Sequence, residues 1–264
     1  MKKNYALILG SSSGFGKAIS LAFAKDGVNI IGVHLDRSGT MPEVENLISE
    51  LKSTGVDIRF FNVNAADATR RAEILDEIEN IFSKEKDATI KVMVHSLAFG
   101  TLKPFIADDP NEAINQRQID MTLDVMANSM VYWTQDIVRR KLMDKGGKIY
   151  AMTSSGGSRQ IQFYGAISAA KACLESYVRQ LAMELGMKGI AINSIRAGVT
   201  ETPALNKIPN SRKIIENALQ RNPEHRLTRP EDVAEFLTGI YKQDSHWLTG
   251  NIINIDGGES VVEL

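Results

Sequence analysis

The chain has 264 residues, 43% of them apolar, so it is long enough to bury a substantial core as one α/β domain. Its 31 basic and 32 acidic residues give a net charge of -1 without long like-charge runs, which argues against a nucleic-acid or anionic-membrane partner recognised by bulk charge. A single cysteine, Cys173, excludes an internal disulfide, and the N-terminal apolar run is too short for a secretory signal or membrane span, so we expect a cytoplasmic protein.

Short apolar runs rich in Val, Ile and aromatic residues alternate with longer segments of helical periodicity. We expect strands at 5–10, 28–35, 57–63, 90–96, 147–154, 190–197 and 251–256, and helices near 15–26, 41–53, 67–85, 111–143, 164–187 and 230–241. This alternation predicts one doubly wound, Rossmann-type α/β domain over residues 1–264, with a seven-stranded parallel sheet and helices on both faces. The polar segment 198–229 is where a substrate lid is expected.

The first predicted strand runs into a glycine-rich stretch, "GSSSGFG", which opens the first predicted helix. Glycines allow a tight turn and a close approach of the backbone to a pyrophosphate, whose charge is met by free N–H groups and the helix dipole. The alternative is a tight turn without a ligand, but the position between a strand and a helix favours a dinucleotide site. The predicted phosphate loop consists of Gly10, Ser12, Ser13, Gly14, Phe15 and Gly16.

The end of the second strand, "GVHLDRS", is expected to face the adenosine ribose. An acidic residue there takes the ribose hydroxyls, and a basic residue takes a 2′-phosphate. The sequence offers both, with Asp36 and Arg37 following His34, so NADH and NADPH both remain open. Alternatively, Asp36 and Arg37 are a solvated pair in a loop.

Ser154, Tyr164 and Lys171 lie after the fifth predicted strand and in the next helix. In a parallel sheet such positions border the ligand crevice, so a phenol that donates a hydrogen bond and an ammonium that holds a ribose and lowers the pKa of the phenol would form a reducing site. Out of this context, a surface lysine and a partly buried aromatic would be the simpler interpretation. The four histidines and one cysteine show no metal-ligand cluster, so we expect no metal.

Over essentially its whole length the sequence resembles the short-chain dehydrogenase/reductase superfamily. The resemblance rests on the glycine spacing, the Ser154, Tyr164 and Lys171 set, "NSIRAGVTET" and the terminal "GNIINIDGG". Ordinary members carry Asn-Asn-Ala-Gly after the fourth strand, an Asn in the next long helix, Tyr four before Lys, and Pro-Gly after the sixth strand. Here these positions read "HSLAFG" (95–100), Met126, Ile167 and Ala197-Gly198.

Each departure is similar to the enoyl-acyl-carrier-protein reductases, which space Tyr and Lys by seven. The glycine loop remains of the ordinary superfamily type, and Ser154 stands where those reductases often place an extra tyrosine, so the resemblance is to a divergent branch. It implies a homotetramer and an enoyl thioester substrate on acyl carrier protein or coenzyme A. It also implies further cofactor contacts from Asn64, Ala65, Ser96, Leu97, Ala98, Lys171, Ala197, Gly198, Val199, Thr200 and Thr202, although Thr202 could instead cap a helix.

The seven-residue spacing has a chemical reason, because seven helical residues rise about 10 Å and displace the phenol from the position four before the lysine. Hydride transfer to the β-carbon of an enoyl thioester places the developing enolate oxygen away from the nicotinamide, and Tyr164 would donate to that oxygen. Two alternatives remain open: a ketone or alcohol dehydrogenase such as a 3-ketoacyl reductase, and a non-catalytic dinucleotide-binding redox sensor. An acyl channel would be lined by Phe99, Phe105, Met152 and Phe163, although such residues are more often core.

Overall fold

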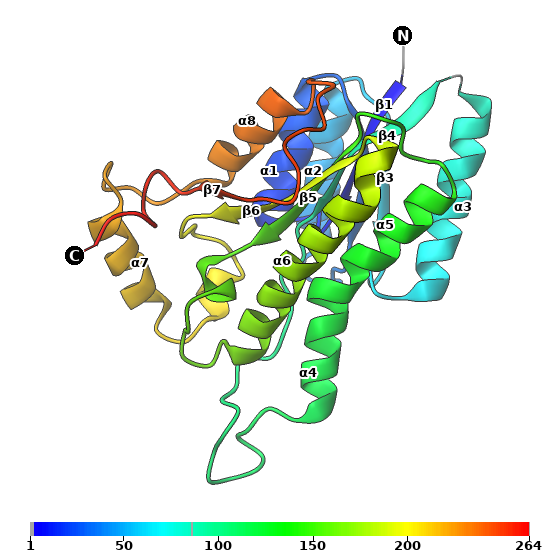
Figure 1. The fold of residues 1–264 in the computed structure, drawn as a ribbon. Coiled ribbons are helices and arrows are strands. Elements are labelled where there is room, and N and C mark those ends of the chain that lie inside the picture. The colour runs from blue at the N-terminus through cyan, green and yellow to red at the C-terminus, as the bar shows by residue number, and fades with distance from the viewer. Residues whose placement is uncertain (1–2, 86, 264) are drawn as a thin grey trace.

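The computed structural model describes residues 3–85 and 87–263 and is built on one seven-stranded sheet in the order β3-β2-β1-β4-β5-β6-β7 (Figure 1). All six strand pairs are parallel. The strands are β1 Lys3–Leu9, β2 Asn29–His34, β3 Ile58–Asn62, β4 Ala88–His95, β5 Lys148–Thr153, β6 Ala191–Ala197 and β7 Ile252–Ile255. The predicted doubly wound Rossmann-type fold is confirmed; residues 1–2, 86 and 264 of the predicted span lie outside the described residues.

Helices cover both faces of the sheet (Figure 1). One apolar cluster packs α1 Gly14–Lys25, α2 Met41–Ser53 and α8 Pro230–Ile240 against one face. A second cluster packs α3 Ala68–Lys84, α5 Ser129–Arg139 and α6 Gly165–Leu185 against the other. The alternation of β1 explains this division, because Ala6 and Ile8 join the first cluster and Tyr5, Leu7 and Leu9 the second.

The helix predicted over 111–143 is wrong at both ends and in the middle. Helix α4 spans Gln116–Leu123, a π-helix spans Asp124–Asn128, and α5 ends at Arg139. The start is determined by a capping box, in which the Asn115 side chain accepts from the Gln118 N–H at 3.0 Å and the Gln118 side chain accepts from the Asn115 N–H at 3.1 Å. The residues after Arg139 leave the helix so that Leu142 can accept the Ile90 N–H at 2.8 Å.

Segment 198–229 is not a plain loop, because it contains the helix α7 Ser211–Arg221. Sequence reasoning missed α7, since the surrounding prolines and polar residues obscured its periodicity. In Figure 1 α7 lies beyond the ends of β6 and β7, and the segment between β4 and α4 extends from the same end of the molecule as a long loop.

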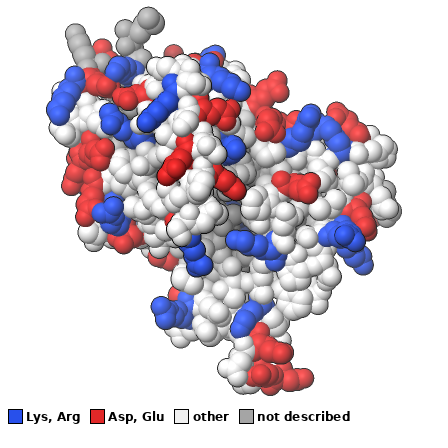
Figure 2. Space-filling view, turned by 180° about the vertical axis from the view of Figure 1, so that it is seen from behind, with Lys and Arg blue, Asp and Glu red and all other residues white. Residues whose placement is uncertain are grey.

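The sheet order places a topological switch point between β1 and β4. From β1 the chain builds outward through β2 to β3, and then returns to the other side of β1 with β4. In open α/β sheets, ligands bind in the crevice beyond the carboxyl ends of the strands at such a point. Figure 2 shows the molecule from behind, where basic and acidic side chains are interspersed without a large area of one sign.

Candidate active site

The glycine loop turns from β1 into α1 at the switch point, and two of its glycines are required by backbone contacts. A Cβ on Gly16 would lie 1.9 Å from the Gly10 carbonyl oxygen, and one on Gly10 would lie 2.4 Å from the Ser96 carbonyl oxygen. Gly14 has φ +50, a conformation that favours glycine. A side chain at any of the three would deform the loop or strain it.

The loop leaves the N-terminus of α1 available for an anion. Ser13 is the N-cap residue, and its side chain makes no capping hydrogen bond. Thr202 comes from the far side of the sheet, since a Cβ on Gly14 would lie 3.5 Å from the Thr202 Cγ2. These residues fit a dinucleotide pyrophosphate, because free N–H groups, the helix dipole and a cradle without side chains meet at one point. Ser12 and Phe15 are partly buried in the same loop.

At the end of β2 the structure holds Asp36 in a fixed orientation. The buried His34 contacts it at 2.9 Å between Nδ1 and Oδ2, and Thr40 Oγ1 donates to Oδ1 at 2.8 Å. Burial alone would raise the pKa of Asp36, but hydrogen bonds, with Ser12 foremost, outweigh it and lower the pKa. The contact with Ser12 ties Asp36 to the glycine loop, whereas Arg37 is exposed.

The other predicted cofactor contacts from β3 and β4 lie at the same edge of the sheet. Asn64 is exposed after β3, and the carbonyl of the buried Ala65 accepts from Trp133 Nε1 at 2.8 Å. Ser96 follows β4, and its N–H donates to the Leu9 carbonyl at 2.8 Å, which places it next to the end of β1. Leu97 and the exposed Ala98 continue from there.

Tyr164 is the N-cap residue of α6 and lies beside Ser154, which follows β5. The Gly156 N–H donates to Ser154 Oγ at 3.2 Å, which leaves the serine hydroxyl proton for the phenol. A Cβ on Gly156 would lie 2.7 Å from Tyr164 Cε1, so this glycine lets the ring approach the turn. Burial raises the pKa of Tyr164, and the hydrogen bond with Ser154 opposes that rise only in part.

Lys171 is buried on α6, and its ammonium donates to the Met152 carbonyl at 2.6 Å. Burial lowers the pKa of Lys171 to about 8, against the opposing attraction of Glu175. The charge of Lys171 does not contribute to the pKa shift of Tyr164, so the structure does not show the predicted lowering of the phenol pKa. The ammonium donates to the Met152 carbonyl, and the phenol is hydrogen-bonded to Ser154 instead.

Position 167, four residues before Lys171, belongs to the protein core rather than to the crevice. Ile167 packs with Met126 of the π-helix and with Ala170, and Tyr164 contacts this small cluster. A Cβ on Gly100 would lie 2.8 Å from Ile167 Cγ1, so the chain after β4 also closes over it. A phenol at 167 would have to displace this packing.

One of the four residues predicted to line an acyl channel belongs to the protein core. Met152 lies in the apolar cluster beneath α1, because alternation along β5 turns its side chain into that face of the sheet, so it is core. Phe105 covers the start of α6, where a Cβ on Gly165 would meet its ring at 2.7 Å. Phe99 and Phe105 are 40% and 53% exposed, and Phe163 is partly buried with φ +63 beside Tyr164.

Three hydrogen bonds hold the backbone just after β6, where the chain passes the crevice. The Gly198 N–H donates to the Ile255 carbonyl at 3.1 Å, and the Val199 N–H donates to Glu259 Oε2 at 2.9 Å. The Val199 carbonyl accepts from Thr228 at 3.1 Å. The neighbouring positions Ala197 and Thr200 therefore have a defined backbone, and Thr202 Oγ1 accepts the Leu205 N–H at 3.2 Å as a local cap.

Sequence reasoning missed a buried polar cluster beneath Lys171. His95 at the end of β4 contacts Ser129 Oγ at 2.9 Å through Nε2, and its Nδ1 is buried without a partner. Burial, followed by the charge of Lys171, lowers the pKa of His95 to about 3, so it is neutral. Glu175 is also buried and accepts from Thr153 at 2.7 Å. The sequence could have indicated Glu175, because residues four apart on a helix lie on the same face and Glu175 is a charged residue four positions after Lys171.

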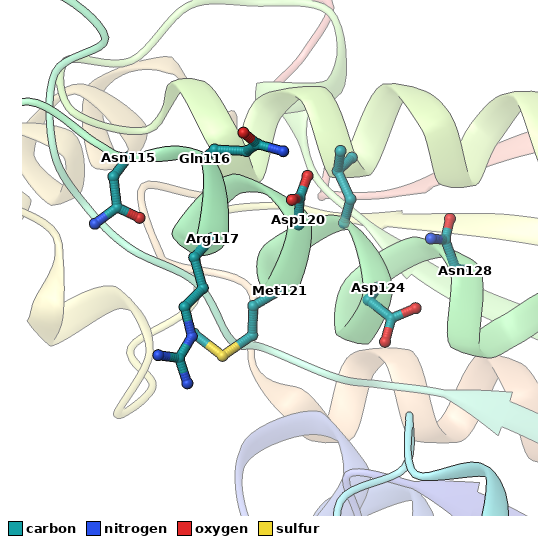
Figure 3. Close-up of a pocket in the computed structure, with 8 residues that line it drawn as sticks. Asn115, Gln116, Arg117, Asp120, Met121, Asp124 and Asn128 are labelled. Atoms are coloured by element: carbon teal, nitrogen blue, oxygen red, sulfur yellow. The ribbon is translucent and has the colours of Figure 1, made fainter.

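A large open hollow of about 910 Å³ lies elsewhere, along α4 and the π-helix (Figure 3). Carboxylate, amide and guanidinium groups line it, and none of them is a predicted site residue. They include Arg117, Asp120, Asp124 and Asn128. Within residues 3–85 and 87–263, no helix is long and apolar enough to cross a membrane, and no group of three or more His, Cys, Asp or Glu side chains could hold a metal ion.

Comparison with known proteins agrees with this architecture. An enoyl-[acyl-carrier-protein] reductase [NADH] FabI of Buchnera aphidicola is 28% identical over 268 residues, covering 100% of this chain and 97% of the relative. A 3-oxoacyl-[acyl-carrier-protein] reductase FabG of Thermotoga maritima is 26% identical over 252 residues, covering 96% of each chain.

A crystal structure of the Bacillus cereus enoyl-acyl carrier protein reductase, with NADP+ and indole naphthyridinone, has the same fold. Its TM-score is 0.86 at 22% identity, with 100% of this chain and 98% of that chain covered. The family model described as enoyl-(acyl carrier protein) reductase matches residues 10–260. The chain therefore belongs to this family of oxidoreductases within the short-chain dehydrogenase/reductase superfamily.

Proposed function

We propose that this protein reduces the 2,3 double bond of an enoyl thioester, carried by acyl carrier protein or coenzyme A, with NADH or NADPH. The observation that carries the proposal is the state of Tyr164. It is a buried phenol at the start of α6, seven residues before Lys171, and its raised pKa keeps it protonated as a hydrogen-bond donor. The position four before the lysine is occupied by the core residue Ile167.

The chain's own residues divide the work of such a reaction. When bound, the nicotinamide supplies a hydride to the β-carbon of the substrate. The glycine loop and the N-terminus of α1 would hold the pyrophosphate, and Asp36 would accept from the ribose hydroxyls. Lys171, which donates to the Met152 carbonyl in this structure, would hold the ribose next to the nicotinamide. Ser96, Leu97 and Ala98, together with the backbone of 197–200, would border the nicotinamide.

Tyr164 acts on the carbonyl oxygen of the thioester. As hydride reaches the β-carbon, negative charge develops on this oxygen, and the phenol stabilises it with a hydrogen bond worth about 2.7–4 kcal/mol. The phenol need not lose its proton, which agrees with its raised pKa. Solvent then protonates the α-carbon. The apolar Met126 fits this scheme, because no relay residue has to resupply Tyr164.

A second candidate is the reduction of a 3-ketoacyl thioester, and the contact between Ser154 and Tyr164 favours it. Two hydroxyls side by side can hold the oxygen of a carbonyl whose own carbon receives the hydride. The similarity to the FabG of Thermotoga maritima points the same way. In this case Ser154 would contact the substrate directly, whereas in enoyl reduction it would only orient the phenol.

Two further parts of the proposal concern the lid and the assembly. Segment 198–229, with α7, lies beside the crevice and would close over the acyl chain, with Phe99, Phe105 and Phe163 beneath it. A homotetramer is supported by large apolar side chains that stand free on the surface, among them Met183, Met187 and Trp247 at 69%, 99% and 89% exposure.

The deciding experiment compares crotonyl and acetoacetyl thioesters, which have equal chain length. Purified protein is incubated with each substrate and with NADH or NADPH, and cofactor oxidation is followed by absorbance. We expect oxidation with the crotonyl substrate and far less with the acetoacetyl substrate. Robust acetoacetyl reduction without crotonyl reduction would support the second candidate, and cofactor binding without any turnover would support a redox sensor.

A further inference from the structure

Among the residues that the structure describes, Glu175 supplies the one carboxylate that acts on the buried charge of Lys171. The two residues are four positions apart on α6 and so lie on the same face of the helix. The carboxyl ends of β5 and β6 meet this face, where Thr153 and Arg196 are paired in register. Thr153 Oγ1 donates to Glu175 Oε1 at 2.7 Å, and Arg196 Nη2 donates to the same oxygen at 3.2 Å.

The carboxylate is shielded from water. The glutamate side chain is 8% exposed and that of Arg196 is 19% exposed. The turn after β5 closes over it, because a Cβ on Gly157 would lie 2.8 Å from Glu175 Oε1. Charge interactions are much stronger at such a site than at the surface. The buried carboxylate of Glu175 is therefore the counter-charge of two cations, Lys171 and Arg196.

Within residues 3–85 and 87–263, the other groups that surround Lys171 bring no negative charge. His95 faces it from β4 and is neutral, with an unpartnered Nδ1. Tyr164 begins the same helix and is a neutral phenol. Arg196, on β6, is itself a cation behind the glutamate, and the Met152 carbonyl on β5 is the only hydrogen-bond acceptor recorded for the lysine among the described residues. Without Glu175, the buried Lys171 and the partly buried Arg196 would lose the carboxylate they share.

We propose that Glu175 is a positioning residue for the reaction: its buried carboxylate, held by Thr153 and Arg196, is the counter-charge that keeps Lys171 an ammonium able to hold the cofactor ribose. This deepens the proposed function and rests on Lys171 binding the cofactor. A neutral amine would lose one charged donor to the ribose hydroxyls. Cofactor affinity must therefore fall as Lys171 loses its proton.

The sign of the pH effect follows directly. Burial already lowers the pKa of Lys171 to about 8 in the free protein, and Glu175 opposes this. Replacing the carboxylate by a neutral amide lowers the pKa of Lys171 further, by about one unit or more, as for an opposite charge nearby. Affinity is then unchanged well below both pKa values and weakened above them. For a one-unit change, the loss at pH 9 is about tenfold, and near pH 6 it is negligible.

The experiment measures NADH and NADPH dissociation constants by nicotinamide fluorescence from about pH 6 to pH 9.5. In the unaltered protein we expect affinity to fall above about pH 8, and Lys171→Met should remove this dependence. Glu175→Gln keeps an acceptor oxygen for Thr153 and should weaken binding about tenfold at pH 9 but not at pH 6. Glu184→Gln is the matched control, an exposed glutamate on the same helix, and should leave the profile unchanged.

The alternatives give different results. A purely structural role for Glu175 would weaken binding by the same factor at every pH, and that result would overturn the proposal. If Glu175→Gln does not fold, Glu175→Asp and the unaltered protein decide. A flat pH profile in the unaltered protein overturns the proposal. So does a Glu175→Asp variant whose midpoint falls by as many pH units as expected for the amide. Binding of neither cofactor at any pH would instead refute the proposed function on which the inference rests.

Discussion

Tyr164→Phe removes a single oxygen and leaves the aromatic ring against Gly156 and the Ile167 cluster. If the phenol stabilises the developing enolate, the lost donor is worth about 2.7–4 kcal/mol, which corresponds to a fall in kcat of about 10²–10³. The Ser154 hydroxyl remains close by and can replace part of this hydrogen bond, so we expect a fall near the lower limit, about 10². Cofactor affinity should stay nearly unchanged, because Lys171 and the glycine loop are not altered.

The assay is steady-state reduction of a crotonyl thioester, with cofactor binding measured separately by fluorescence. Ser154→Ala is the paired variant: it should reduce enoyl turnover only slightly, since the carbonyl oxygen lies toward Tyr164. A Tyr164→Phe variant with nearly full enoyl activity would refute the assignment of the phenol. Robust 3-ketoacyl reduction that collapses in Ser154→Ala would show that the serine holds the substrate oxygen, as the second candidate requires.

Three further predictions follow from the loop, the ribose contact and the surface. Gly16→Ala places a Cβ 1.9 Å from the Gly10 carbonyl oxygen, so it should abolish cofactor binding and destabilise the fold by about 1–3 kcal/mol. Gly39→Ala is the control, because a Cβ there meets open space, and it should change neither property. Fluorescence titration measures the binding and thermal unfolding measures the stability. Asp36→Ser should raise the affinity for NADPH relative to NADH by about tenfold; an unchanged ratio would place the ribose elsewhere. Light scattering should give a tetramer, and a monomer at all concentrations would contradict the proposed assembly.

Local patterns accounted for most of the architecture. Apolar runs identified the positions of the seven strands of the sheet, and the central strands are the most apolar because they are buried on both faces. The glycine spacing identified the turn between β1 and α1, and the structure explains it through contacts of Gly10 and Gly16 with backbone atoms. Periodicity could not find the start of α4, which depends on a reciprocal side-chain cap at Asn115.

The predicted site residues that depend on strand ends were brought together by the fold. Ser154 and Tyr164 lie ten residues apart in the sequence and meet because the turn after β5 leads directly into α6. Met152 was misassigned to the acyl channel, because strand alternation turns it into the core. The sequence alone cannot show that the Met152 side chain points into the core, because this depends on which face of the sheet each position of β5 occupies.

The sequence by itself determined the order of the seven strands, most of the helices between them, the glycine loop and the identity of the polar residues after each strand, because these follow from local periodicity and spacing. Only the tertiary structure decided the protonation states. Lys171 has a pKa of about 8 because it is buried, and Glu175 opposes that burial from a pocket formed by β5 and β6. Desolvation and charge pairing depend on what surrounds a group in space, and residues far apart in the chain supply those surroundings.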